Sequence, residues 1–342
     1  MDALLEVKDL EVTISLKEGA VRAVNGVSFR IPANRTLGVV GESGCGKSMT
    51  ARALLRILPP GGRIVGGQIR LAPRDGHSTG VVDIAALPPR SRALRAIRGG
   101  EIAMIFQEPM TSLSPVHSIG DQIGEGVRLH RKTSKREARE RAVEMLRLVG
   151  VPMPERRVDA YPHQLSGGLR QRSMIAIALA CRPRLLIADE PTTALDVTIQ
   201  AQILNLIERL QREMAMSVMM ITHDLGVIAE TADEVAVMYL GRIVEYAPVR
   251  DLFDSPMHPY TQGLLASIPR IGRPSGRTLY SIPGTVPDPY TMPPGCPFHP
   301  RCPQRIAGVC DRGEPPAPVE AGPNHQVACR LYESRQGEAD DA

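Results

Sequence analysis

The sequence lacks the long hydrophobic runs that mark a membrane-spanning or exported chain. No uninterrupted apolar run approaches the ~20 residues of a bilayer-crossing helix. The best candidate, Met174 to Cys181, is interpreted as a buried helix. Residues 1–6 lack the basic start and apolar stretch of a signal peptide. We therefore expect a reducing compartment, where the six cysteines are free thiols or metal ligands. Any membrane role would then come through a partner.

A strong charge imbalance is also lacking. The 41 Lys and Arg against 37 Asp and Glu leave a net charge of +4, too small to argue for a nucleic-acid partner. Hydrophobic residues make up 43%, which excludes global disorder. Residues 248–342 hold 17 of the 30 prolines and 4 of the 6 cysteines. This C-terminal region should be loop-rich and held by something other than a hydrophobic core.

Apolar segments alternate with helical patterns up to about residue 248. Four short β segments are expected over residues 4–40. Further strands are predicted over residues 102–106, 185–188, 218–221 and 234–239, with helices between them. Ser134 and Glu137 form a capping box that should begin one helix. Continuous apolar strands alternating with helices predict a mostly parallel α/β core.

A glycine-rich loop follows the predicted strand Thr36–Val40, and a helix opens directly after it. The loop fits the pattern G-x-x-x-x-G-K-[ST] in the strand–loop–helix context that the pattern requires. Its backbone N–H groups can point at phosphates beside the positive end of the helix. Lys47 is then suited to bind the β- and γ-phosphates, and Ser48 is suited to bind Mg²⁺. Cys45 is interpreted as a small filler residue. The alternative to the whole assignment is a glycine-rich turn that matches the pattern by chance. The predicted nucleotide-binding residues are Gly41, Glu42, Ser43, Gly44, Cys45, Gly46, Lys47, Ser48 and Met49.

Two carboxylates stand at the end of the predicted strand over residues 185–188. Asp189 suits the Mg²⁺ shell of a phosphate-loop enzyme. Glu190 suits a general base that orients the attacking water. Alone, this pair would be an ordinary strand terminus, but with the phosphate loop it favours nucleotide hydrolysis.

The segment Leu165-Ser166-Gly167-Gly168-Leu169-Arg170-Gln171 closely resembles the signature motif of ATP-binding-cassette (ABC) ATPases. A serine and glycine amides at a helix N-terminus form an anion site. In that family the site holds the γ-phosphate of the nucleotide on the facing subunit. Gln107, the run Ala194-Leu195-Asp196, and His223 resemble further landmarks in the same order. The resemblance covers the chain to roughly residue 248.

The resemblance implies a P-loop ABC-type α/β ATPase with a RecA-like core and an N-terminal antiparallel β subdomain. It implies an ABC domain over 1–248, with a helical signature subdomain over about 108–182, and a Pro/Cys-rich extension over 249–342. The cofactors are then ATP and Mg²⁺. The family usually stacks adenine on an aromatic upstream of the loop; this chain has none before Phe29, and Val21 or Arg22 could substitute. The implied sites are catalytic Glu190, His223, Gln107 and Lys47; signature residues Leu165, Ser166, Gly167, Gly168 and Gln171; Asp196 at the dimer interface; and Ser48, Gln107 and Asp189 for Mg²⁺.

Four segments resemble the peptide importer branch of that family: Gln107–Val116, Tyr161–Gln164, Thr192–Leu204 and Met257–Gln262. They imply the ATP-hydrolysing subunit of a di- or oligopeptide importer, or of a nickel or other small-solute importer. Such a subunit lies peripherally on the cytoplasmic side of the bacterial inner membrane. Its partners are a second ATPase subunit (identical or a paralogue), two permeases and an extracytoplasmic substrate-binding protein, with no direct nucleic acid. The rival class, soluble ABC ATPases acting on nucleic acid or ribosomes, usually shows a coiled-coil insertion, two cassettes or a basic stripe; none is visible here.

Four cysteines of the C-terminal region, Cys296, Cys302, Cys310 and Cys329, have the spacing C-x5-C-x7-C-x18-C. Thiols converging in a reducing compartment suggest a metal centre that replaces a missing core. The absence of close C-x-x-C pairs counts against a zinc ribbon. Importer subunits resembling this chain carry a [4Fe–4S] cluster on this quartet, which we therefore predict. Zinc, with His299 or His325 in a mixed site, and four unliganded thiols remain the alternatives.

Overall fold

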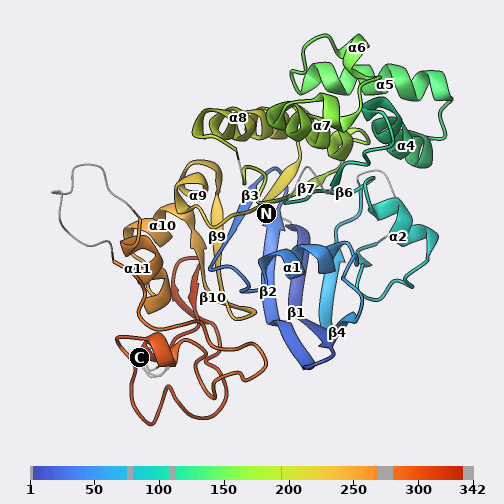
Figure 1. Cartoon of the computed structure of the whole chain (residues 1–342). Helices are drawn as coiled ribbons and strands as arrows, with labels where there is room; N and C mark the ends of the chain where they lie inside the picture. The colour runs from blue at the N-terminus through green and yellow to red at the C-terminus, as the bar shows by residue number, and fades with distance from the viewer. Residues whose placement is uncertain (1–2, 75–79, 108–111, 194, 269–279, 334–342) are drawn as a thin grey trace. The chain divides into compact units, whose positions relative to one another are not determined.

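The computed structural model describes residues 3–74, 80–107, 112–193, 195–268 and 280–333 (Figure 1). The chain divides into two compact units. Unit 1 comprises Met1–Leu4, Ile31–Thr36 and Ala86–Ile221, and unit 2 comprises Leu5–Arg30, Leu37–Ala85 and Thr222–Ala342. Residues 108–111 of the importer-like segment and Ala194 lie outside the described residues.

The first sheet of unit 2 has the strand order β2-β1-β4-β5. Its strands are β1 (Ala3–Leu16), β2 (Gly19–Pro32), β4 (Gly62–Leu71) and β5 (Val82–Asp83). β4 pairs antiparallel with both β1 and β5. Two of the predicted short segments are halves of β1, because the strand continues through register shifts between Lys8 and Val12. The predicted N-terminal antiparallel sheet is therefore confirmed.

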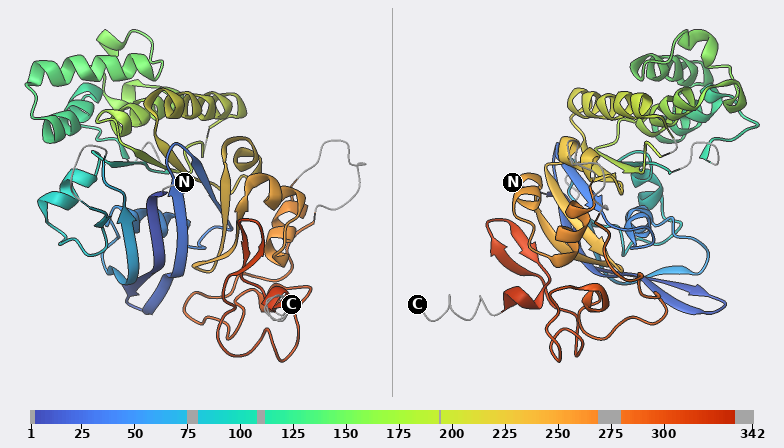
Figure 2. Two further views of the ribbon diagram at one scale, coloured as in Figure 1. Left: turned by 180° about the vertical axis from the view of Figure 1, so that it is seen from behind. Right: turned by 60° about the vertical axis from the view of Figure 1, so that its left-hand side comes forward.

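Five further strands of unit 2 belong to the larger sheet, in the order β11-β12-β10-β9-β3. β3 (Thr36–Val40) runs parallel to β9 (Glu234–Tyr239), and β10 (Arg242–Pro248) returns antiparallel. β12 (His325–Val327) pairs with β10, and β11 (Val319–Gly322) pairs with β12, both antiparallel (Figure 2). The C-terminal region thus adds a hairpin to the sheet, which the sequence analysis did not predict.

Short helices accompany these strands in unit 2. They are α1 (Lys47–Leu54), α9 (Leu225–Thr231), α10 (Val249–Asp254), α11 (Pro259–Ala266), η2 (His299–Arg301) and α12 (Arg330–Glu333). Val319, Val327 and Cys329 form a small buried cluster against which Leu331 and Tyr332 pack. The described part of the C-terminal region therefore has a modest apolar core of its own.

Unit 1 contains three parallel strands in the order β8-β7-β6. They are β6 (Ile102–Ile105), β7 (Leu185–Asp189) and β8 (Ser217–Ile221), and every residue in them is buried. Burial on both faces explains why these strands read as continuous apolar runs without alternation. The predicted parallel α/β character is confirmed here.

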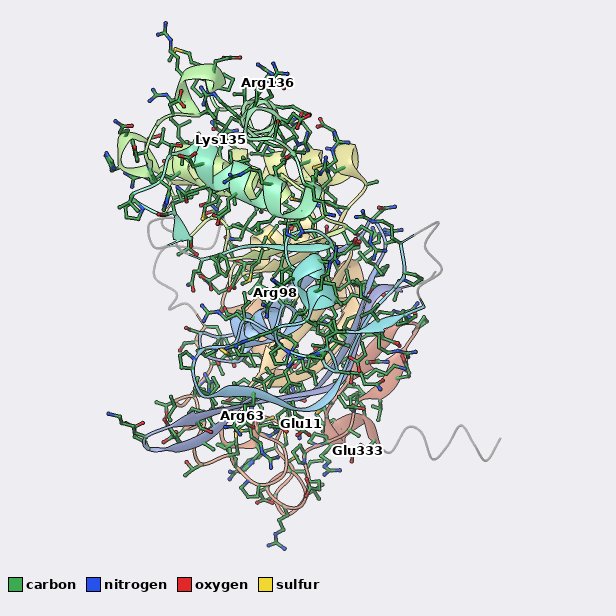
Figure 3. All side chains as sticks on the ribbon, turned by 90° about the vertical axis from the view of Figure 1, so that its right-hand side faces the viewer. Glu11, Arg63, Arg98, Lys135, Arg136 and Glu333 are labelled. Atoms are coloured by element: carbon green, nitrogen blue, oxygen red, sulfur yellow. The ribbon has the colours of Figure 1, made fainter. Side chains whose placement is uncertain are left out.

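The helices of unit 1 are α2 (Arg92–Ile97), α4 (Ile119–Arg131), α5 (Lys135–Leu148), α6 (Pro154–Arg157), η1 (Pro162–Gln164), α7 (Gly167–Leu179) and α8 (Val197–Met214). α4, α5 and α7 lie side by side (Figure 1). The capping box predicted for α5 is present between Ser134 and Glu137. Lys135 and Arg136 in its first turn lie at the surface (Figure 3), where Arg136 forms an exposed pair with Glu140. Among the described residues, no helix combines the length and apolar character needed to cross a membrane.

Candidate functional site

The glycine-rich loop in unit 2 connects β3 to α1, as the sequence predicts. Two positions in the loop require glycine, because a backbone carbonyl oxygen lies where the Cβ of any other residue would stand. Gly41 has φ 151°, and a Cβ there would stand 2.2 Å from the Met238 carbonyl oxygen. Gly46 has φ 106°, and a Cβ there would stand 2.4 Å from the Ala23 carbonyl oxygen. The loop can therefore keep this path only with glycine at both positions.

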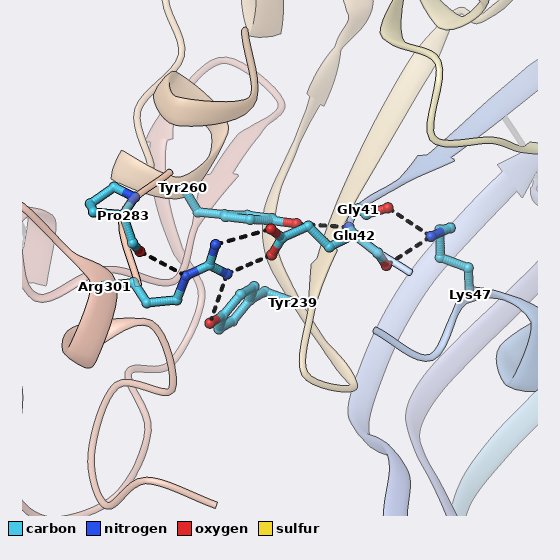
Figure 4. A network of polar contacts seen from close by, with 7 residues as sticks. All are labelled: Gly41, Glu42, Lys47, Tyr239, Tyr260, Pro283 and Arg301. Atoms are coloured by element: carbon cyan, nitrogen blue, oxygen red, sulfur yellow. Dashed lines mark hydrogen bonds and ion pairs between the residues drawn. The ribbon is translucent and has the colours of Figure 1, made fainter. Parts of the chain in front are cut away.

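Lys47, the first residue of α1, turns its side chain back over the loop and is 5% exposed. Its Nζ donates to the carbonyl oxygens of Gly41 at 2.7 Å and Glu42 at 3.0 Å (Figure 4). The ammonium group is thus held at the centre of the loop. Burial raises the pKa of the Cys45 thiol although Lys47 acts in the opposite direction, which agrees with its interpretation as a filler.

Two residues outside the predicted site contact this loop in unit 2. The hydroxyl oxygen of Tyr260 accepts the Glu42 N–H at 2.8 Å, and Arg301 pairs with the Glu42 carboxylate at 2.6 Å. Tyr260 belongs to the importer-like segment Met257–Gln262, so its importance could have been predicted from the sequence. No local pattern marks Arg301, which stands 259 positions after Glu42.

The acidic strand end in unit 1 has an unusual backbone. Asp189 is the last residue of β7 and is 2% exposed. Glu190 has φ 49°, which is a left-handed backbone conformation. In a residue other than glycine this conformation costs about 1–3 kcal/mol, and residues that adopt it cluster at active sites. Its N–H donates to the Ile221 carbonyl oxygen at 2.9 Å, which ties the turn to the end of β8.

The side chain of Glu190 is oriented by two donors. Its Oε2 accepts hydrogen bonds from Gln107 Nε2 and Thr193 Oγ1, each 2.9 Å long. The structure thus brings together two residues, Gln107 and Glu190, that the sequence placed in the site from separate motifs. Thr193 was not among the predicted site residues, although its position after the acidic pair was an available signal. A carboxylate fixed in this way is suited to orient a water molecule.

The signature segment in unit 1 presents an open helix end. Ser166 is the N-cap of the 13-residue helix α7, yet its side chain makes no capping hydrogen bond. Ser166 and Gly167 are exposed, whereas Leu165 is buried. Gly168 lies close to α8, because a Cβ there would stand 3.3 Å from Ile199. Gln171 is buried and donates to the Pro191 carbonyl oxygen, so α7 is tied to the turn after Glu190. This helix N-terminus can accept an anion.

Asp196 and His223 follow the strands as predicted. The Asp196 carboxylate accepts the Ile199 N–H at 3.0 Å and caps α8. His223 is exposed and belongs to unit 2, directly before Asp224, which caps α9. Asp196 therefore has a structural role, and its role at a dimer interface stays a prediction.

The four C-terminal cysteines line one small cavity in unit 2, together with His258 and His299. Burial raises the pKa of Cys296 to about 11 and that of Cys329 to about 12. Nevertheless, within the described part of the chain no three His, Cys, Asp or Glu side chains form a group that could hold a metal ion. The four cysteines thus share one cavity, but the structure does not support the [4Fe–4S] cluster, which stays a prediction. His325 does not line this cavity; it binds Glu245 at 2.8 Å.

Comparison with known proteins adds independent evidence. Residues 24–193 match the family described as ABC transporter, and residues 244–310 match the oligopeptide/dipeptide transporter C-terminal region. The probable peptide ABC transporter ATP-binding protein y4tR of Sinorhizobium fredii is 53% identical and covers 96% of this chain and 95% of that protein. The dipeptide transport ATP-binding protein DppD of Bacillus subtilis is 48% identical, over 98% of this chain and 96% of that protein. The solved dimeric structure of MJ0796, a bacterial ABC transporter cassette, matches with a TM-score of 0.62 at 26% identity, covering 72% of this chain and 99% of that one. The predicted fold class is thereby confirmed, and the chain belongs to the ATPases of the ABC transporter family.

Proposed function

We propose that this chain is the ATP-hydrolysing subunit that powers import of di- and oligopeptides across the bacterial cytoplasmic membrane. The observation that carries the peptide assignment is the match of residues 244–310 to the oligopeptide/dipeptide transporter C-terminal region. Two relatives named for dipeptide and oligopeptide transport are 48% and 50% identical in sequence to this chain over nearly its whole length. Residues 1–248 form the ABC domain in this proposal, with the helical subdomain over about 108–182, and residues 249–342 form the extension.

The nucleotide site of the proposal uses the loop residues 41–49. Lys47 leaves its carbonyl partners for the β- and γ-phosphates, and the loop amides hold the phosphate oxygens. Ser48, Gln107 and Asp189 would hold Mg²⁺, which supplies charge neutralisation at the phosphates. Because phosphoryl transfer needs little covalent help, catalysis comes from positioning and charge stabilisation.

Hydrolysis in this proposal depends on Glu190. Its carboxylate, oriented by Gln107 and Thr193, accepts a proton from the attacking water as the water oxygen bonds to the γ-phosphorus. The bond from that phosphorus to the β–γ bridging oxygen breaks, and ADP is the leaving group. His223 contacts the γ-phosphate and maintains the geometry of that water. The left-handed backbone at Glu190 supports the assignment, since such strain persists where function requires it.

The proposal requires a second ATPase subunit, either a copy of this chain or a paralogue. The exposed N-terminus of α7, with Ser166, Gly167 and Gly168, would receive the γ-phosphate of the nucleotide held by the facing subunit, and Asp196 would lie at that interface. The dimeric state of the MJ0796 cassette supports this arrangement. Two membrane permeases and an extracytoplasmic substrate-binding protein complete the importer, and the chain lies peripherally on the cytoplasmic face.

We further propose that Cys296, Cys302, Cys310 and Cys329 hold a metal centre. The support is the chemistry of the lining: four soft thiols, the ligands of iron–sulfur and zinc sites, face one cavity, although among the described residues they would have to draw closer together to hold the metal. The buried Nε2 of His258, which lines the same cavity, has no hydrogen-bond partner among the residues that the structure describes. A [4Fe–4S] cluster is favoured over zinc and would replace part of the missing hydrophobic core.

The transport proposal is tested by expressing the chain with its proposed partners, namely two permeases, a substrate-binding protein and, where the second ATPase is a paralogue, that subunit. We expect the chain to purify with the permeases and the assembled importer to accumulate labelled di- or oligopeptide in vesicles supplied with internal ATP. The matched control replaces the chain with Glu190→Gln, which should assemble but not transport. Uptake of nickel without peptide would move the chain to the metal-importing alternative. Failure to associate with permeases, with ATPase activity stimulated by nucleic acid or ribosomes, would overturn the importer.

A further inference from the structure

Arg301, from the C-terminal region, forms a two-pronged ion pair with Glu42 of the glycine-rich loop. Nη1 lies 2.6 Å from Oε2, and Nη2 lies 3.0 Å from Oε1 (Figure 4). The Arg301 side chain is 4% exposed and that of Glu42 is 28% exposed. Parallel bonds between a guanidinium and a carboxylate fix orientation as well as charge.

Arg301 is itself held in place by unit 2. Its Nε donates to the Pro283 carbonyl oxygen at 3.1 Å, and Nη1 lies 3.5 Å from the Tyr239 hydroxyl. The guanidinium carbon lies 5.9 Å from the centre of the Tyr239 ring. The hydrogen bonds to Glu42 raise the pKa of Arg301 above its usual value, so its charge is permanent. The position of the Glu42 carboxylate therefore follows the fold of the C-terminal region.

Tyr260 fixes the backbone of the same loop residue. Its hydroxyl oxygen accepts the Glu42 N–H at 2.8 Å. The ring is fully buried and packs against Tyr239 at 4.7 Å and Phe298 at 5.4 Å between centroids. The N–H of Glu42 thus points to the tyrosine, and its carbonyl oxygen accepts from Lys47.

The contacts that Arg301 and Tyr260 make with Glu42 come from outside the segment that carries the phosphate-loop pattern. Arg301, which contacts the loop, and Phe298, which packs on Tyr260, both lie between Cys296 and Cys302, two of the proposed metal ligands. Without Arg301, the Glu42 carboxylate would stand uncompensated beside a loop that has to accept phosphates, and like charges repel. Without Tyr260, the Glu42 N–H would lose its acceptor.

We propose that Arg301 and Tyr260 are positioning residues of the nucleotide site, acting through Glu42. They make the affinity of the phosphate loop for nucleotide depend on the folded C-terminal region. The inference rests on the proposed binding of nucleotide by the loop. Beyond that proposal, the inference assigns the C-terminal region a role in positioning the nucleotide site.

The test measures MgADP binding by calorimetry and steady-state ATP hydrolysis on the full-length chain. Arg301→Met should weaken MgADP binding and raise KM for ATP by about tenfold, the effect of losing one charge-assisted contact of ~1.4 kcal/mol. kcat at saturating ATP should change by less than about threefold, because bound nucleotide restores the loop. Arg301→Lys should recover part of the affinity, and the double change Glu42→Gln with Arg301→Met should bind better than Arg301→Met alone. Tyr260→Phe, which keeps the ring, should weaken binding in the same direction.

Two controls separate the possible failures. Arg250→Met removes an arginine whose pair with Asp254 is exposed, and it should leave MgADP affinity unchanged. Lys47→Ala should abolish binding; if it does not, the assignment of the loop fails, whatever Arg301 does. If Lys47→Ala abolishes binding while Arg301→Met lowers only the melting temperature and leaves affinity and KM unchanged, Arg301 is merely structural and the inference is overturned.

Discussion

The side-chain amide of Gln107 donates a 2.9 Å hydrogen bond to Oε2 of Glu190, an oxygen that Thr193 also approaches at 2.9 Å. The two residues stand 83 positions apart, each just beyond a strand of the same parallel sheet. Because carboxyl ends of parallel strands share one edge of a sheet, the fold delivers both side chains to one place. Gln107 therefore sets the orientation of the carboxylate that we assign to water activation.

Glu190→Gln should reduce ATP hydrolysis by about 10²–10⁴-fold, because an amide cannot accept the proton of the attacking water. Binding of MgATP should persist, since the change leaves the phosphate loop untouched. Phosphate release and equilibrium binding measure the two effects. The control, Glu208→Gln, alters an exposed glutamate on α8 that pairs with Arg212. Unchanged turnover in Glu190→Gln would remove Glu190 as the base.

Gln107→Ala should lower kcat by about tenfold, because Glu190 loses an orienting donor while the base itself remains. Gln107→Glu should be worse, since a second carboxylate at this distance repels the first. The ratio of kcat to KM across pH distinguishes the two, as only the second introduces a new titrating neighbour. Gln202→Ala, an exposed position on α8, serves as the control. Equal kcat values in Gln107→Ala and the parent would show that Thr193 suffices.

Ser166→Arg should abolish ATP-dependent dimer formation without lowering the melting temperature. Its side chain is exposed and makes no capping bond, so the change costs the isolated chain little, whereas a large cation blocks the anion site at the end of α7. Light scattering in the Glu190→Gln background measures the dimer. Ser134→Ala should show the opposite pattern, because Ser134 does cap α5 and its loss costs about 1 kcal/mol. Dimers formed by Ser166→Arg would argue against a role at a facing nucleotide.

Much of the fold could be predicted because local chemistry determines it. β6, β7 and β8 are buried on both faces and so are apolar except for Asp189 and Ser217 at strand ends, which the sequence shows directly. The glycine-rich loop was predictable for a similar reason, since a side chain at Gly41 or Gly46 would collide with backbone oxygens. The capping box of α5 depends on only two residues three positions apart.

Features that depend on distant partners could not be predicted. β11 and β12 have four and three residues and are strands only because β10 offers them an edge. Arg301 has no pattern around it that names Glu42 as its partner. The left-handed backbone at Glu190 likewise depends on the end of β8, where the Ile221 carbonyl oxygen accepts its N–H.

Anaerobic purification should give a brown protein with about four irons per chain if the cysteines hold the proposed cluster. Cys329→Ser should lose the colour and most of the iron, because each thiolate is needed to hold the cluster. Cys181→Ser is the matched control, since Cys181 is half-buried in unit 1 and lies apart from the lining of that cavity. Colourless protein with about one zinc per chain would replace the cluster with a zinc site. Protein free of both metals would leave four thiols and defeat the metal centre.

Glu245→Ala should destabilise the β10–β12 region by about 3 kcal/mol or more, because buried donors lose their acceptor. The Glu245 carboxylate is 1% exposed and accepts the N–H groups of Met257 and His258 at 2.7 and 2.9 Å. It also binds His325 Nε2 at 2.8 Å.

Glu245→Gln keeps one acceptor oxygen and should cost less, about 1–2 kcal/mol. Native-state hydrogen exchange of the β10 and β12 amides reports the local free energy of opening. Glu320→Ala on β11 is the control, since Glu320 is exposed and bonds only Gln326 among the contacts seen, and it should stay within ~0.5 kcal/mol. Equal losses in the two variants would show that the buried carboxylate does not hold the hairpin to β10.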